Sequence, residues 1–342
     1  MDSLGGLENP PSYLMTNLPT GKRVLSGIQA SGTFHIGNYF GATRQHIGLQ
    51  DGNDVRIFIA DYHSMNSVRD GNLRRKHTQD LALDYLALGL DPKRTIFYRQ
   101  SDLPEVQELT WILGTVAPMG LLQRAHAYKD ATAKGEDVLA GLFNYPVLMA
   151  ADILIHDADI VPVGQDQKQH IEIARDLAEK INQQYGEVLK LPVSYIPEEV
   201  AVVPGTDGRK MSKSYGNTIE VFAPPKTIKK QVMGIVTDST PVEDPKDPTL
   251  PLFQLWNLFA TVDERTVMAD RCKQGGVGYG EVKKDLLERL TSNFEPATER
   301  REELVKNPDT VEDVLRDGAK RAREAVTPLM ERVREATGLG SN

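Results

Sequence analysis

Cysteine is almost absent from this sequence, which contains only Cys272 among its 342 residues. One cysteine cannot form a disulfide framework or a cysteine-built zinc or iron–sulfur site, and this scarcity is typical of proteins in a reducing cytoplasm. The sequence also lacks any apolar run of the roughly 18 residues that a membrane-spanning helix requires. The first twenty residues have neither a basic start nor an apolar segment, so they do not indicate a secretory signal. We therefore expect a cytoplasmic protein with no membrane association.

An excess of positive charge is missing as well. The sequence has 40 lysine and arginine residues against 48 acidic ones, which gives a formal net charge of −8. Non-specific DNA binding depends on neutralising many phosphates, so we expect no DNA partner. Contact with RNA would have to use local basic patches. One such patch is Lys226, Lys229 and Lys230, and a second covers residues 316–334. Acidic residues are interleaved in the second patch, so a salt-bridged solvent face is at least as good an interpretation of it as an RNA surface.

Two common phosphate-binding motifs are also absent. The loop after the first predicted strand (23–29) is neither Gly-x-Gly-x-x-Gly nor a P-loop ending in Gly-Lys-Ser/Thr, which disfavours a dehydrogenase or a P-loop ATPase. This loop does carry Ser31-Gly32 and His35-Ile36-Gly37-Asn38, and a helix is predicted to follow it to about Leu49. A strand, a glycine-bearing loop and a helix in this order favour anion binding, because backbone N–H groups at the start of the helix face the ligand.

Strand and helix patterns alternate along the first part of the chain. Such alternation predicts an α/β fold with a Rossmann-like, doubly wound parallel sheet, whose ligands gather at the carboxyl ends of the strands. From about Lys226 the pattern changes to helices joined by loops. We expect a flexible N-terminal arm (1–20), a Rossmann-like domain (21–222), a smaller α-helical domain (223–308), and a C-terminal helix (309–342) that could return to the first domain.

A lysine-containing loop is predicted at residues 208–216, around Lys210-Met211-Ser212-Lys213-Ser214. Two ammonium groups on a mobile element can reach a polyphosphate and follow its charge as a bond breaks. A Lys-x-x-Lys loop taken alone is most often a solvated surface turn. The whole pentapeptide would occur by chance in a chain of this length with a probability of ~10⁻⁴. A functional interpretation therefore needs a partner motif.

Polar residues occur at three other places, either within an apolar stretch or next to the end of a predicted strand. Asp152 lies in the apolar stretch 141–154, where helical spacing allows either the polar side of the helix or a buried position that needs hydrogen bonds. His63 follows the end of a strand and is either a pocket residue or a structural histidine. The group Gly164-Gln165-Asp166-Gln167 joins a predicted strand to a helix, where it can cap the helix or bind ribose hydroxyls and an ammonium group.

His35-Ile36-Gly37-Asn38 after the first strand and Lys210-Met211-Ser212-Lys213-Ser214 after the last resemble the two signature motifs of class I aminoacyl-tRNA synthetases. The likeness runs from about residue 23 to the C-terminal helix and is most similar to the bacterial tryptophanyl branch. The stretches that carry it are Gly27-Ile28-Gln29 with Ser31-Gly32, Tyr145-Pro146, Leu148-Met149-Ala150-Ala151-Asp152-Ile153-Leu154, Val161-Pro162-Val163-Gly164 with Asp166-Gln167, His170 with Arg175-Asp176, and Gly278-Tyr279-Gly280.

This resemblance implies an enzyme that activates L-tryptophan with ATP and transfers it to tRNA(Trp), acting as a homodimer. It implies that residues 21–222 form the catalytic domain and that the helical domain (223–308) binds the anticodon. It implies that Mg²⁺ is held mainly by the ATP phosphates rather than by a protein metal site. Catalysis would use Gln29, Asn38, Lys210, Ser212 and Lys213. ATP would contact these residues together with Ala30, Ser31, Gly37, Gly164, Gln165, Asp166, Met211 and Ser214.

The resemblance also implies a pocket for tryptophan. Asp152 would accept a hydrogen bond from the indole N–H, and phenylalanine, which lacks that donor, would be rejected by about 10⁴–10⁵. The indole would be walled by apolar residues and one histidine, and two polar residues would lie near the amino group. The wall is Leu25, His63, Met149, Val161 and Val163, and the two polar residues are Tyr145 and Gln167.

Some positions depart from the family pattern, and three rival functions stay open. Ala30 stands where proline is common, Gln165 stands where an acidic residue is common, and the alignment of Lys129 and Lys134 with the family's mobile ATP loop is ambiguous. A tyrosyl-tRNA synthetase is a rival because a phenol also donates to a carboxylate. The others are a catalytically silent paralogue with a regulatory or RNA-binding role and a small-molecule adenylyltransferase.

Overall fold

The computed structural model of the protein describes residues 18–30, 32–164, 167–196 and 202–340. Its described part contains a five-stranded, all-parallel sheet in the order β3-β2-β1-β4-β5. The strands are β1 (Arg23–Ile28), β2 (Asp54–Ile59), β3 (Thr95–Arg99), β4 (Ile160–Pro162) and β5 (Val193–Tyr195). The order reverses between β1 and β4, as in a doubly wound sheet. The fold class predicted from the sequence is confirmed.

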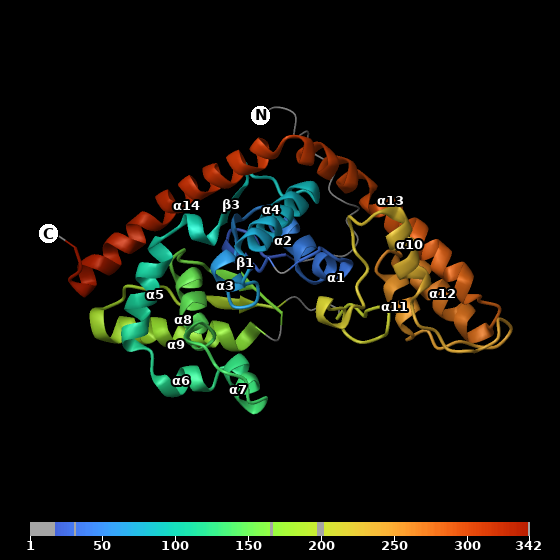
Figure 1. The fold of residues 1–342 in the computed structure, drawn as a ribbon, viewed down its shortest axis with the longest axis horizontal. Coiled ribbons are helices and arrows are strands. Elements are labelled where there is room, and N and C mark those ends of the chain that lie inside the picture. The colour runs from blue at the N-terminus through green and yellow to red at the C-terminus, as the bar shows by residue number, and fades with distance from the viewer. Residues whose placement is uncertain (1–17, 31, 165–166, 197–201, 341–342) are drawn as a thin grey trace.

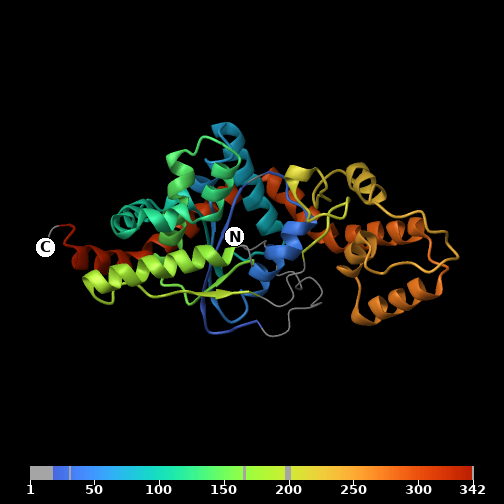
Figure 2. The same cartoon turned by 90° about the horizontal axis from the view of Figure 1, so that it is seen from below.

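Helices surround this sheet and extend away from it (Figure 1). Figure 2 shows the sheet and its helices at one end of the molecule and the later helices at the other. The helices are α1 (Ile36–Asn38), the π-helix η1 (Tyr39–Thr43), α2 (Arg44–Gly48), α3 (Asp61–Ser64), α4 (Gly71–Ala87), the 3-10 helix η2 (Gln100–Asp102), α5 (Glu105–Val116), α6 (Met119–Gln123), α7 (His126–Ala133), α8 (Ala140–Leu154), α9 (Lys168–Tyr185), the 3-10 helix η4 (Lys213–Tyr215), α10 (Pro225–Met233), α11 (Pro251–Asn257), α12 (Val262–Gln274), α13 (Tyr279–Lys306) and α14 (Pro308–Thr337).

Two hydrophobic cores lie on the two faces of the sheet. Side chains alternate between the faces along each strand, so Val24 joins the first core and Leu25 the second. The first core includes residues of α4 and continues into α11, α12 and α13. The second core is formed with α5, α8 and α9. The buried residues of the long helix α9, among them Ile171, Ala174 and Leu177, form the apolar stripe that faces this core.

Helix α14 crosses β3 at close range. A Cβ atom at Gly318 would lie 1.8 Å from the backbone oxygen of Phe97, so only glycine allows this approach. Arginines of α14 then hold it to the sheet domain: Arg321 donates to the backbone oxygens of Pro92 and Thr95, and Arg332 donates to the backbone oxygen of Val188. The basic residues near the C-terminus therefore include anchors of α14, in addition to solvent-facing cations.

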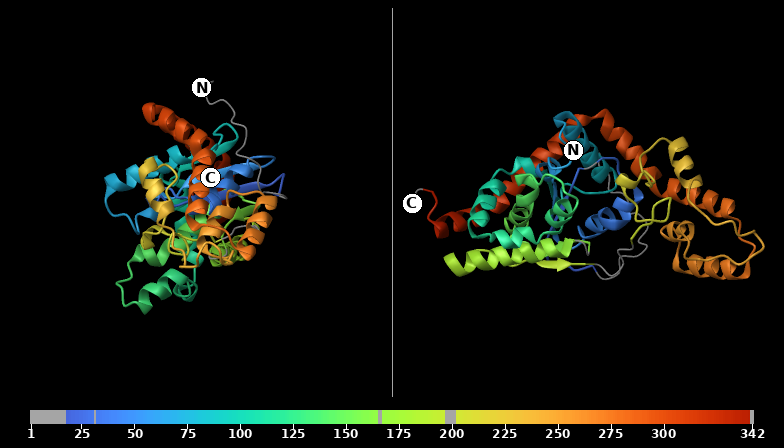
Figure 3. Two further views of the ribbon diagram at one scale, coloured as in Figure 1. Left: turned by 90° about the vertical axis from the view of Figure 1, so that its right-hand side faces the viewer. Right: turned by 60° about the horizontal axis from the view of Figure 1, so that its bottom comes forward.

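Helices α13 and α14 meet at the apex of the molecule in Figure 1, and the two views of Figure 3 show α14 along the sheet domain and α13 among the later helices. Near this apex Arg301 of α13 forms an ion pair with the buried Asp84 of α4, with 2.6 Å between Nε and Oδ1. Burial raises the pKa of Asp84 to about 6, and Arg301 opposes that shift. The domain boundaries given above stay a prediction. No helix in the described part of the chain is long and apolar enough to cross a membrane.

Candidate active site

Several sequence-predicted residues gather at the carboxyl edge of the sheet. Gln29 and Ala30 follow β1, His63 lies on α3 just after β2, and Gly164 follows β4. This edge includes the point between β1 and β4 where the strand order reverses, which is the usual ligand position in an open α/β sheet. The fold therefore brings residues distant in sequence to one edge.

The two predicted signature motifs meet in the structure. The segment after the lysine loop pairs with the first loop, since Ile36 N donates to Ile219 O at 3.0 Å and Val221 N donates to Phe34 O at 3.1 Å. A Cβ atom at Gly32 would lie 3.6 Å from Cδ and 3.9 Å from Nζ of Lys213. The lysine side chain thus reaches the first loop directly.

Asn217 organises the lysine loop from its end. Its side chain is buried, and its Nδ2 donates to Asp207 Oδ1 at 2.7 Å and to Lys210 O at 3.2 Å. Its Oδ1 accepts a hydrogen bond from Ser212 N at 2.8 Å. Sequence reasoning missed this residue as a site component, although its place directly after Gly216, which has a left-handed φ of 62°, marks a built turn.

Burial shapes the charges around the two loops. It lowers the pKa of Lys213, and the carboxylate of Asp84 opposes this shift. It also lowers the pKa of His35 to about 4, with a smaller contribution from the charge of Lys213. His35 is therefore neutral at pH 7, whereas Lys213 supplies a positive charge that is partly shielded from water. A cation in this position suits an anionic ligand between the loops.

Asp152 is buried within α8, which excludes the alternative that it faces solvent. Its side chain is 2% exposed. Its Oδ2 lies 3.0 Å from Nε2 of His63, and Nε2 of Gln100 donates to both carboxylate oxygens at 2.8 Å. Burial raises the pKa of Asp152 above its ordinary value. The hydrogen bonds from His63 and Gln100 oppose this shift without cancelling it. His63 is thus a partner of Asp152, and Gln100 is a site residue that the sequence analysis did not name.

The residues predicted to wall an indole share the core that contains α8. Leu25 and Val161 are buried members of this core, and Met149 and Val163 are partly buried against it. Tyr145 lies edge-on to His63, with 6.2 Å between ring centroids, and its hydroxyl is 2.8 Å from Nε2 of His170. The side chains proposed for one pocket therefore come from β1, α3, α8 and the region of β4.

Other predicted residues have local contacts or lie outside the described part. The amide of Gln29 donates to Ser67 Oγ at 3.3 Å, and Asn38 Oδ1 accepts from His35 N at 3.1 Å as part of a capping box. Met211 is buried, and Ser212 Oγ lies 2.9 Å from Ser214 Oγ. Ser31, Gln165 and Asp166 lie outside the described residues, and Gln167 precedes α9 as its N-cap.

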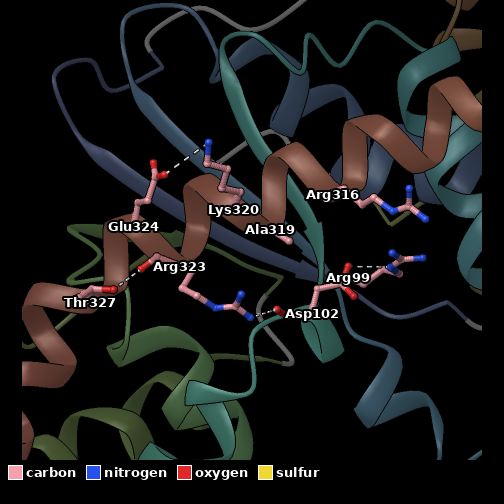
Figure 4. Close-up of a pocket in the computed structure, with 8 residues that line it drawn as sticks. All are labelled: Arg99, Asp102, Arg316, Ala319, Lys320, Arg323, Glu324 and Thr327. Carbon is pink, nitrogen blue, oxygen red and sulfur yellow. Dashed lines mark hydrogen bonds and ion pairs between the residues drawn. The ribbon is translucent and has the colours of Figure 1, made fainter.

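The exposed cleft in Figure 4 lies apart from these loops, between α14 and the end of β3. Its volume is about 620 Å³, and its lining includes four cations. These cations are paired with acidic groups: Arg99 with Glu312, Arg316 with Glu312, Lys320 with Glu324, and Arg323 with Glu105. The cleft therefore has the character of a salt-bridged face, which was one of the two interpretations of this basic stretch.

The family model of class I tRNA synthetases for tryptophan and tyrosine (W and Y) matches residues 20–295. The chain therefore belongs to the class I tRNA synthetases of this type. Its similarity to curated relatives is high over almost the full length. It is 52% identical over 322 residues to a tryptophan–tRNA ligase of Fusobacterium nucleatum, covering 94% of this chain and 99% of that protein. It is 54% identical over 318 residues to that of Rhodopirellula baltica, covering 93% and 99%.

Among solved structures, the chain is similar to a tryptophanyl-tRNA synthetase from Campylobacter jejuni in complex with ADP and tryptophan. The identity is 49%, the TM-score is 0.86, and the match covers 93% of this chain and 100% of the other. These relatives put the chain in the bacterial tryptophan branch of the family.

Proposed function

We propose that the chain acts as a tryptophan–tRNA ligase, which joins L-tryptophan to the 3′ end of tRNA(Trp) and converts ATP to AMP and pyrophosphate. The observation that carries this proposal is the close approach of the Lys213 side chain to Gly32, which brings the lysine loop against the first loop at the sheet edge. The buried carboxylate of Asp152 with its two partners supplies the second element, a polar group in an apolar core. The relatives in the tryptophan branch support the choice of amino acid.

In the first step a carboxylate oxygen of tryptophan attacks the α-phosphorus of ATP. A phosphorus–oxygen bond forms, the bond to the bridging oxygen breaks, and pyrophosphate leaves with the electron pair. No protein nucleophile is needed, so the protein acts by positioning the reactants and stabilising charge. Lys210, Ser212 and Lys213 are proposed to hold the pyrophosphate group, while Gln29, Ala30, Gly37 and Asn38 lie along the nucleotide on the first loop.

Mg²⁺ is proposed to accompany ATP and to neutralise the developing charge on the pyrophosphate when bound. The described residues contain no group of three or more His, Cys, Asp and Glu side chains that could hold a metal ion. The ATP phosphates would supply most of its ligands. Gly164, together with Gln165 and Asp166, is assigned to the ribose of ATP.

Tryptophan is proposed to enter the pocket around α8 with its indole N–H toward Asp152. An ionised carboxylate offers acceptors only, and the indole nitrogen offers a donor only, so the pair is complementary. Leu25, Met149, Val161 and Val163 would contact the ring, with His63 beside the carboxylate. Tyr145 and Gln167 would lie near the amino group, which keeps the reacting carboxylate pointed toward ATP.

In the second step a ribose hydroxyl of the tRNA 3′-terminal adenosine attacks the tryptophanyl carbonyl and loses its proton. An ester bond forms, the bond from the carbonyl carbon to the phosphate oxygen breaks, and AMP leaves with the electron pair. The test of the whole sequence is charging of a tRNA(Trp) transcript with labelled tryptophan. We expect charging that requires ATP, Mg²⁺ and tRNA(Trp) and fails with a tRNA(Tyr) transcript. Charging of tRNA(Tyr) with tyrosine would assign the chain to the rival specificity.

A second copy of the chain is the proposed occupant of an apolar surface on α5 and α6. Trp111 is 77% exposed and Met119 is 63% exposed. Exposed apolar patches mark interaction surfaces, and a homodimer is the assembly that the family resemblance implies.

Replacing Trp111 by lysine is therefore expected to convert a dimer to a monomer at micromolar concentration. Light scattering coupled to size exclusion would measure this mass. Val262, which is 63% exposed on α12, provides the matched control, because Val262→Lys should leave the mass of a dimer unchanged. A monomeric unmodified protein, or a dimer that persists in the Trp111→Lys variant, would contradict the proposal.

A further inference from the structure

Gln100 links three parts of the site through one buried amide. It begins η2 directly after β3 and is 1% exposed. Its Nε2 donates to both oxygens of Asp152 on α8, at 2.8 Å each. Its Oε1 accepts a hydrogen bond from the backbone N–H of Tyr62 on α3 at 3.1 Å. The ends of β2 and β3 are thereby connected to the carboxylate.

These contacts determine which way the amide points. The Tyr62 N–H can only donate, so the oxygen of Gln100 must face it, and the NH₂ group must then face Asp152. A leucine or methionine at this position would keep the volume but remove the donor. A glutamate would keep the acceptor for Tyr62 but place a second carboxylate against Asp152. Glutamine is the side chain that satisfies both neighbours.

In the described part of the structure, the two carboxylate oxygens of Asp152 accept different numbers of hydrogen bonds. Oδ2 contacts both Gln100 and His63, whereas Oδ1 contacts Gln100. Because each carboxylate oxygen has two lone-pair sites, Oδ1 keeps more accepting capacity for a ligand. The double contact with Gln100 also resists rotation of the carboxylate about its last bond, which fixes the direction of that remaining acceptor site.

We propose that Gln100 is a positioning residue for amino-acid selection: its amide fixes the Asp152 carboxylate so that Oδ1 accepts the indole N–H of the substrate. This inference rests on the proposed function, in which Asp152 binds the indole. Gln100 acts through Asp152 and not on the reacting atoms. Its loss should therefore weaken recognition of the N–H group and spare the chemistry at the α-phosphorus.

The test compares L-tryptophan with its benzothienyl isostere, in which sulfur replaces the indole N–H. Amino-acid-dependent ATP–pyrophosphate exchange gives kcat and KM for both substrates. In Gln100→Met we expect the KM for tryptophan to rise about 10-fold to 100-fold, the range for a weakened hydrogen bond to a charged group. We expect kcat to change less than about 3-fold and the KM of the isostere to stay near its original value, because the isostere makes no N–H bond.

Gln50 supplies a matched control. It is also a buried glutamine that contacts two segments, since its Nε2 donates to Ile47 O and its Oε1 accepts from Asp91 N, but it lies by the amino end of β3. Gln50→Met should lower stability without changing the ratio of the tryptophan and isostere KM values. A Gln100→Met protein with an unchanged ratio, or with both KM values raised equally, would overturn the inference.

Gln100→Glu provides a second, nearly isosteric variant in case the methionine protein does not fold. It should lose at least as much preference for tryptophan over the isostere as Gln100→Met, and a glutamate variant with the original preference would overturn the inference. Failure of the proposed function is distinguishable, because the unmodified protein would then show no tryptophan-dependent exchange at all.

Discussion

Replacing Asp152 by asparagine is expected to reduce the preference of the enzyme for tryptophan over phenylalanine by at least 100-fold. The starting preference should be about 10⁴–10⁵, since a site that hydrogen-bonds a substrate N–H leaves its polar group unpaired when the donor is missing. In the variant, the NH₂ group of asparagine would replace one of the two acceptor oxygens and would face a donor of Gln100 or His63. Tryptophan binding should weaken for this reason, while phenylalanine no longer faces a buried charge.

The measurement is kcat/KM for both amino acids in ATP–pyrophosphate exchange. Asp270, an exposed residue of α12 that pairs with Lys273, provides the control, and Asp270→Asn should leave the preference unchanged. If Asp152→Asn retained the original discrimination, the indole would have to be recognised elsewhere.

Replacing Lys213 by alanine is expected to lower kcat for adenylate formation by about 10²–10³, which corresponds to roughly 3–4 kcal/mol of transition-state stabilisation. Lys213 reaches the first loop at Gly32 and is partly buried, so its charge acts through less water than that of the exposed Lys210. The loss in Lys213→Ala should therefore exceed the loss in Lys210→Ala.

Single-turnover formation of the adenylate would separate this effect from ATP binding. The KM for tryptophan should stay near its original value, and Lys226→Ala on the exposed side of α10 should behave like the unmodified protein. A variant with raised KM for ATP and unchanged kcat would show that Lys213 contributes only to ground-state binding.

The fold was predictable because its signals are local. β1 spans Arg23–Ile28, within one residue of the strand predicted over residues 23–29, because a short apolar run followed by a glycine-bearing loop marks it. The helix predicted to run to Leu49 is instead divided by the π-helix over Tyr39–Thr43. No residue pattern in that stretch marks such a change.

The site was less predictable because its contacts are distant in sequence. The pattern around Asp152 allowed a solvent-facing position, since its partners Gln100 and His63 are 52 and 89 residues away. A stricter use of the strand-end rule would have identified Gln100, which directly follows β3. The docking of α14 depends on the close approach of Gly318 to Phe97. No local sequence pattern predicts this approach.

The most direct test of this account is ATP–pyrophosphate exchange by the unmodified protein, measured without tRNA and with each amino acid in turn. We predict that tryptophan drives the fastest exchange and that phenylalanine, which lacks the N–H donor, drives exchange lower by about 10⁴ or more in kcat/KM. Exchange driven by tyrosine would contradict the assignment of Asp152 to the indole N–H. Absence of exchange with every amino acid would contradict the catalytic function itself and favour a silent paralogue.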